Sequence, residues 1–218
     1  MNARASRTWV AALMVLGVLT GCATTYYSVW ETLGYQKRDI LKTRVERARD
    51  SQQQAFERFE AVAQASAPLA SASDGAVDTA RQLQSLRVAY RNAARTASTV
   101  RTHIDQVDDV SQALFVEWEE ELINTASSTQ RSNDHQELAD TRQAYNGLMG
   151  AMRGAEAGIT PVLNTVEDSM RGLEDVDGAL TSTQVSGFLS LQGDLERLTA
   201  ELRRSIDAAT RFAERLER

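Results

Sequence analysis

Residues 83–118 read LQSLRVAYRNAARTASTVRTHIDQVDDVSQALFVEW. Apolar or aromatic side chains recur here over five heptads, at steps that alternate between three and four residues, and Ser111 is the one polar member of the series. Such a repeat is typical of a long helix that buries one stripe against other helices. The series runs through Leu83, Leu86, Tyr90, Ala93, Ala97, Val100, Ile104, Val107, Ser111, Leu114 and Trp118.

The same repeat occurs in three other parts of the chain. It predicts helices over about 29–66, 76–124, 133–180 and 184–217, separated by stretches of small polar residues, Gly or Pro. Long helices joined by short connections predict an all-α fold, an elongated antiparallel, coiled-coil-like bundle of about four helices. We expect residues 29–218 to form this bundle as a single domain.

The third predicted helix contains an unusual run of glycines. Gly147, Gly150, Gly154 and Gly158 precede Pro161 within its apolar seam. Each glycine costs ~1 kcal/mol relative to alanine on an exposed helix face, and a proline removes one backbone donor. We expect this region to be the softest part of the bundle, or the place where another backbone comes closest.

The start of the chain has the pattern of a signal peptide. Arg4 and Arg7 precede an apolar run of 11 residues, Trp9–Leu19. A bilayer-spanning helix needs roughly 20 apolar residues. The run is therefore too short for a transmembrane anchor, and we expect residues 1–21 to be removed.

The apolar run ends in Leu-Thr-Gly-Cys at residues 19–22, which resembles the lipobox of bacterial lipoprotein precursors. The resemblance implies that Cys22 is lipidated and that residues 22–28 form a tether to the membrane. Ala23 replaces the aspartate that commonly retains such proteins at the inner membrane, so we expect an outer-membrane location facing the periplasm. The alternative is an ordinary signal peptide followed by an unmodified cysteine.

Composition argues against several classes of function. The net charge of the 218-residue chain is −6, which disfavours nucleic acid and anionic membrane surfaces as broad electrostatic partners. There are two histidines, and no metalloprotease, CxxC, nucleophile-elbow or phosphate-loop motif occurs. We therefore expect no catalytic residues, no metal and no cofactor, and a protein that is not an enzyme.

Charge is unevenly distributed along the second predicted helix. Residues 81–101 contain five arginines and no acid, whereas residues 102–130 contain acids and no Lys or Arg. One interpretation pairs the acids with basic residues of the first predicted helix, because Lys37 and Asp105 each lie about 34 residues from the intervening turn. These basic residues are Lys37, Arg38, Lys42, Arg44, Arg47 and Arg49. The other is a docking strip for a basic partner or divalent cations. The candidate acidic strip comprises Asp105, Asp108, Asp109, Glu117, Glu119 and Glu120.

Three stretches resemble a known family: YYSVWETLGYQKRDIL (26–41), VDDVSQALFVEWEEEL (107–122) and AMRGAEAGITPVL (151–163). The family is one of uncharacterised proteobacterial lipoproteins, catalogued as a domain of unknown function. The resemblance covers nearly the whole chain after the signal peptide. It implies an envelope lipoprotein of helical hairpins and assigns no catalytic residues.

Two functions fit these observations. One is a membrane-anchored, non-enzymatic structural or adaptor rod with an envelope protein as partner. The alternative is a periplasmic chaperone-like or hydrophobic-ligand-binding bundle that opens near residues 147–161.

Overall fold

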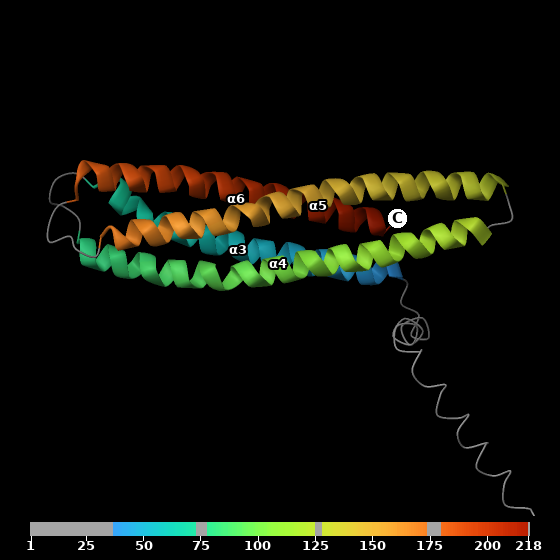
Figure 1. Cartoon of the computed structure of the whole chain (residues 1–218), viewed down its shortest axis with the longest axis horizontal. Helices are drawn as coiled ribbons and strands as arrows, with labels where there is room; N and C mark the ends of the chain where they lie inside the picture. The colour runs from blue at the N-terminus through green and yellow to red at the C-terminus, as the bar shows by residue number, and fades with distance from the viewer. Residues whose placement is uncertain (1–36, 73–77, 125–127, 174–179, 218) are drawn as a thin grey trace, which may run out of the picture. The chain divides into compact units, whose positions relative to one another are not determined.

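A computed structural model describes residues 37–72, 78–124, 128–173 and 180–217. These residues form four α-helices and no strand, which confirms the predicted all-α class (Figure 1). The chain divides into two units, Met1–Ile40 and Leu41–Arg218, and the first is described only over residues 37–40. The helices are α3 (Lys37–Ala70), α4 (Thr79–Asn124), α5 (Ser128–Arg171) and α6 (Ser182–Leu216).

Within Leu41–Arg218 each helix packs antiparallel to the next, and α6 also packs against α3. Residue numbers increase along α4 in the direction in which they decrease along α5, as the ion pairs Arg101–Glu156 and Arg142–Glu119 show. The α3–α6 contacts have the same sense. They are Lys42–Glu217 at 2.5 Å and Ser205 Oγ to Gln52 Oε1 at 2.8 Å.

The predicted apolar seams form the core. Most members of the α4 series are buried, and Tyr90, Ala97 and Trp118 are partly buried against the same core. Ser111 is completely buried, and its hydroxyl donates to the Val107 carbonyl at 2.7 Å. A short polar side chain is tolerated in this seam because the preceding helical turn satisfies it.

The first helix extends beyond its predicted end at residue 66. α3 continues through Pro68 to Ala70, although 66–75 was predicted as a loop. Pro68 removes one backbone donor, but Leu69 and Ala70 after it are buried in the core. Burial of about one leucine side chain contributes ~1.5–3 kcal/mol, enough to favour the additional turn.

The boundary between the last two helices is also different from the prediction. α5 ends at Arg171 rather than 180, and Gly172 follows. Residues 181–184, predicted as a break, instead begin α6. Thr181 is the N-cap: its hydroxyl accepts from the Gln184 amide at 3.3 Å, and the Gln184 side chain accepts from the Thr181 amide at 2.8 Å. This reciprocal pair is a capping box, which satisfies two donors left open at a helix start.

The glycine run of α5 makes one close approach rather than four. A Cβ added at Gly158 would lie 3.1 Å from Leu198 Cδ1 and 3.2 Å from Glu201 Oε2, both on α6. A Cβ added at Gly147 or Gly150 would meet nothing within 4 Å. The atoms nearest to this Cβ belong to side chains of α6 and not to its backbone, so the predicted close approach of another backbone is not observed at Gly158, where small size instead makes room for Leu198 and Glu201.

Polar side chains fix the alignment of α3 and α6. Gln52 and Ser205 are both completely buried and hydrogen-bonded to each other. Gln192 of α6 donates to the Ala63 carbonyl at 2.9 Å and to Ser66 Oγ at 2.8 Å on α3. Sliding either helix by one heptad would strand these groups without partners, which costs more than the loss of an exposed hydrogen bond.

Candidate functional site

The structure divides the predicted acidic strip of α4 between two environments. Asp105, Asp108 and Glu119 bind basic side chains of α5. These three members of the strip are therefore committed to contacts inside the bundle. The other three members are half-buried or exposed: Glu117, Asp109 and Glu120.

Arg153 of α5 is the centre of the first contact group. Its Nη2 lies 2.7 Å from Asp105 Oδ1 and 3.6 Å from Asp108 Oδ2. Tyr145 Oη donates to Asp108 Oδ1 at 2.6 Å, and Gln112 Nε2 donates to the same oxygen at 2.9 Å. The hydrogen bonds from Tyr145 and then Gln112, with a smaller contribution from Arg153, lower the pKa of Asp108. Charge-assisted bonds of this kind hold the carboxylate in its ionised form.

The second contact group lies nearer the α4–α5 connection. Arg142 Nη1 is 2.6 Å from Glu119 Oε1, and this bond lowers the pKa of Glu119. The guanidinium of Arg142 also lies over the Phe115 ring, 5.1 Å from its centroid. Phe115 in turn packs edge-on against Tyr145 with ring centroids 5.3 Å apart. The two groups therefore form one continuous polar and aromatic seam between α4 and α5.

The predicted pairing of Asp105 and Asp108 with the first helix is wrong. Their partner is Arg153 of α5, while α4 presents Gln106 to α3, where Arg44 Nη1 donates to it at 3.0 Å. Lys42, one of the expected partners, binds Glu46 at 3.8 Å and Glu217 at 2.5 Å. The expected partners Lys37 and Arg38 belong to the other unit of the chain.

The helical repeat explains this error. Neighbouring residues differ by about 100° around a helix. Asp105 and Gln106 therefore lie on different flanks of α4, toward α5 and toward α3 respectively. Equal distance from a turn sets how far along the bundle two residues lie, but it does not set the flank.

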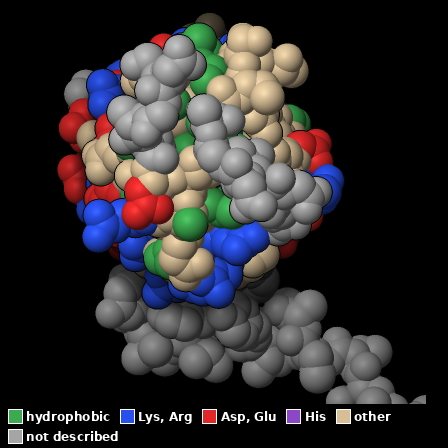
Figure 2. Space-filling model, turned by 90° about the vertical axis from the view of Figure 1, so that its left-hand side faces the viewer, with side chains coloured by type: hydrophobic (Ala, Val, Ile, Leu, Met, Phe, Trp, Pro, Cys, Tyr) green, Lys and Arg blue, Asp and Glu red, His purple; other side chains and the backbone are tan. Residues whose placement is uncertain are grey.

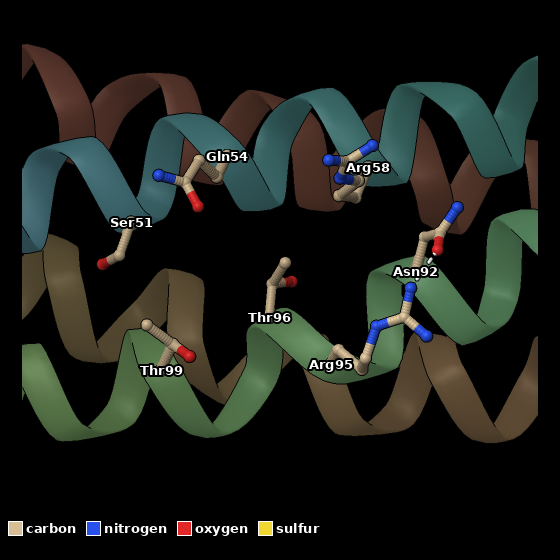
Figure 3. Close-up of a pocket in the computed structure, with 7 residues that line it drawn as sticks. All are labelled: Ser51, Gln54, Arg58, Asn92, Arg95, Thr96 and Thr99. Atoms are coloured by element: carbon tan, nitrogen blue, oxygen red, sulfur yellow. Dashed lines mark hydrogen bonds between the residues drawn. The ribbon is translucent and has the colours of Figure 1, made fainter.

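A polar cleft between α3 and α4 was not anticipated from the sequence (Figure 3). Its volume is about 200 Å³. The sequence signal for this cleft is a group of polar and basic residues on one flank of α4, between positions 92 and 99. The lining side chains are Ser51, Gln54 and Arg58 of α3 and Asn92, Arg95, Thr96 and Thr99 of α4.

The remaining residues with possible metal or nucleophilic chemistry are His103, His135 and Cys22. The described ranges contain no group of three or more His, Cys, Asp or Glu placed to hold a metal ion. His103 is half-buried at the edge of the α4 seam, and His135 is exposed. Cys22, the predicted lipidation site, lies outside the described residues.

The chain matches a family model described as "Protein of unknown function (DUF2959)" over residues 26–216. No curated protein and no solved structure shows a significant match. Among the described helices, none is both long and apolar enough to cross a membrane.

Proposed function

The chain belongs to the DUF2959 family of proteins of unknown function, and from that premise we propose that it is a lipid-anchored structural or adaptor rod of the bacterial cell envelope. In this proposal the protein has no enzymatic activity. Its acylated N-terminus holds it on a membrane, and its helical bundle presents outer faces to an envelope protein.

The observation that carries the proposal is the Leu-Thr-Gly-Cys sequence at residues 19–22, directly after an 11-residue apolar run. Each buried acyl CH₂ contributes ~0.8 kcal/mol, and stable anchoring takes at least two chains or a second signal. A cysteine carrying a diacylglyceryl group and an N-acyl chain meets that requirement. Ala23, in place of an aspartate, supports outer-membrane delivery.

The bundle supports the mechanical part of the proposal. The longest helix, α4, has 46 residues, which corresponds to ~69 Å at 1.5 Å per residue. Its apolar seam is directed inward, whereas residues such as Asp109 and Arg91 are exposed. A helix pair of this length holds two points of the envelope at a set separation without chemistry of its own.

Mass spectrometry of the full-length protein, expressed in a Gram-negative host, tests the anchor. The wild-type protein should lose residues 1–21 and gain the mass of a diacylglyceryl group and an acyl chain. Cys22→Ser should abolish the added mass, while Ala23→Ser, one residue away, should keep it. Globomycin should cause acylated precursor to accumulate. An unacylated wild-type chain would refute the anchor.

In-cell photo-crosslinking tests the adaptor role. A crosslinker at an exposed position such as Asp109 or Leu189 should capture the same envelope protein reproducibly. The alternative, a bundle that opens to grip apolar molecules, predicts strong binding of a hydrophobic dye by the folded chain. Strong dye binding without crosslinked partners would favour that alternative over the rod.

A further inference from the structure

The α3–α4 cleft combines two cations with neutral hydrogen-bonding groups and contains no acid in its lining. Arg58 projects from α3 and Arg95 from α4, on opposite walls of the cleft (Figure 3). Ser51, which is buried, and Thr96 donate their hydroxyls to carbonyls of their own helices, at 2.8 Å and 2.7 Å. The protons of these two hydroxyls are therefore used within their own helices, and no carboxylate of the lining faces the two guanidiniums.

The donors of the cleft are largely unused. Among the described residues, Arg58 has no ion-pair or hydrogen-bond partner, and neither the Gln54 amide nor the Thr99 hydroxyl has a hydrogen-bond partner. Arg95 donates to Asn92 Oδ1, which orients its guanidinium and leaves four of its five N–H groups. The Asn92 amide nitrogen is also available for donation. The cleft thus offers donors from both walls and two positive charges.

The surrounding surface strengthens this positive character. Residues 81–101 of α4 contain five arginines and no acid, although the chain as a whole has a net charge of −6. Basic side chains gather at the lower side of the bundle end where α4 begins (Figure 2). On α3, the neighbouring Glu57 accepts from Gln53 at 3.1 Å rather than binding Arg58.

A second hollow adjoins the cleft and has a different lining. Its volume is about 530 Å³, and Asn92 lines both. Aliphatic side chains, including Ala61, Ala65 and Val88, make up much of its surface, and Val88 is 45% exposed. A ligand with an anionic head in the cleft would therefore place an uncharged part against an apolar wall.

We propose that this α3–α4 cleft binds the phosphate group of an organic phosphate, with Arg58 and Arg95 on either side of the phosphate and the organic part along the adjoining hollow. Two guanidiniums match the near-dianionic charge of a phosphate monoester at pH 7, whereas a carboxylate would neutralise only one. Guanidinium groups also present their donors in a planar fork suited to phosphate oxygens. The site is independent of lipidation at Cys22.

Calorimetric titration of the full-length protein in detergent tests the proposal, with butyl phosphate, inorganic phosphate and butyrate as probes. Butyl phosphate should bind more tightly than inorganic phosphate, and butyrate should bind at least about tenfold more weakly than butyl phosphate. The double variant Arg58→Gln, Arg95→Gln should lose at least about tenfold in butyl phosphate affinity. Arg211→Gln removes an exposed arginine of α6 and should change the affinity less than about twofold.

Two further arms complete the test. Ser85→Phe fills the adjoining hollow from an exposed position and should remove the advantage of butyl phosphate over inorganic phosphate. Vesicles containing phosphatidic acid, whose headgroup is a phosphate monoester, determine the source of the phosphate: retention that the double variant abolishes indicates a lipid headgroup, and retention that it leaves unchanged indicates a water-soluble ester. Two results would overturn the proposal. One is no heat of binding at about 5–10 mM butyl phosphate, a range typical of weak sites. The other is an equal loss of butyl phosphate affinity in the double variant and in Arg211→Gln. Matching melting curves confirm that the variants fold.

Discussion

Replacing Tyr145 by phenylalanine should destabilise the bundle through one hydrogen bond. Tyr145 Oη donates to Asp108 Oδ1 at 2.6 Å, and the rest of the ring is packed against Phe115 and Phe212. Removing only the oxygen keeps this packing. It leaves the ionised Asp108 with Gln112 and Arg153 as its remaining partners.

The magnitude follows from the type of bond and its exposure. A hydrogen bond to a charged group contributes roughly 1.5–3 kcal/mol when well buried. The Asp108 side chain is 32% exposed, so water replaces part of the lost interaction. We expect Tyr145→Phe to lower the free energy of unfolding by about 1–2 kcal/mol at pH 7.

The loss should depend on pH in a defined direction. Tyr145 is the first cause of the lowered pKa of Asp108, whose ordinary value is 3.8. A carboxyl group with a lowered pKa in the folded state contributes stability above its ordinary pKa, and this stability is lost as pH falls through the folded value. The difference between wild type and Tyr145→Phe should therefore be full at pH 7 and shrink below about pH 4.

Urea unfolding of Ala23–Arg218, followed by circular dichroism at 222 nm, measures the effect. A double-mutant cycle of Tyr145→Phe with Asp108→Asn should give a coupling energy of about 1–2 kcal/mol. Tyr90→Phe is the matched control, because Tyr90 donates to Glu167 across the same helix pair in an exposed bond of 3.2 Å. It should cost no more than about 0.5 kcal/mol. A Tyr145–Asp108 coupling below about 0.3 kcal/mol, or equal losses at both tyrosines, would refute the reasoning.

Three further substitutions have defined outcomes in the same assay. Arg153→Glu places a fourth negative charge beside its three carboxylate partners Asp105, Asp108 and Glu156, so it should cost about 1–3 kcal/mol at low ionic strength, and 0.5 M salt should reduce the loss. Thr181→Ala removes the N-cap of α6 and should cost about 1 kcal/mol, whereas Thr181→Ser should cost little. Gly147→Ala should stabilise the bundle by about 0.5–1 kcal/mol, and Gly158→Ala should gain less, because its Cβ would press on Leu198; an equal gain at both glycines would contradict the close approach.

The fold could be predicted because apolar periodicity is local. Each seam is a property of one helix, and side chains such as Leu86, Phe59 and Leu195 are completely buried as their spacing requires. Helix ends were less predictable because they depend on single contacts. The capping pair of Thr181 and Gln184 is readable in the sequence, but it competed with the small, polar character that suggested a break.

The contacts of the candidate sites could not be predicted for a geometric reason. Asp105 has two neighbouring helices at the same height, and only its angular position selects Arg153 of α5. The α3–α4 cleft is a relation between Arg58 and Arg95, which are far apart in the sequence and carry no shared motif. The predicted lipidation site at Cys22 is of the opposite kind, since that prediction rests on one contiguous stretch, residues 19–22.

The contact between Lys42 and Glu217 determines how the bundle responds to force. It places the start of α3 and the end of α6 side by side within Leu41–Arg218. Tension applied between these two points peels the helices apart turn by turn, so only a few seam contacts carry the load at any moment. Tension between Lys42 and the start of α6, which lies at the other end of the α3–α6 seam, instead shears that whole seam at once. A partner gripping the start of α6 would therefore meet a much stiffer and stronger link than one gripping the C-terminus.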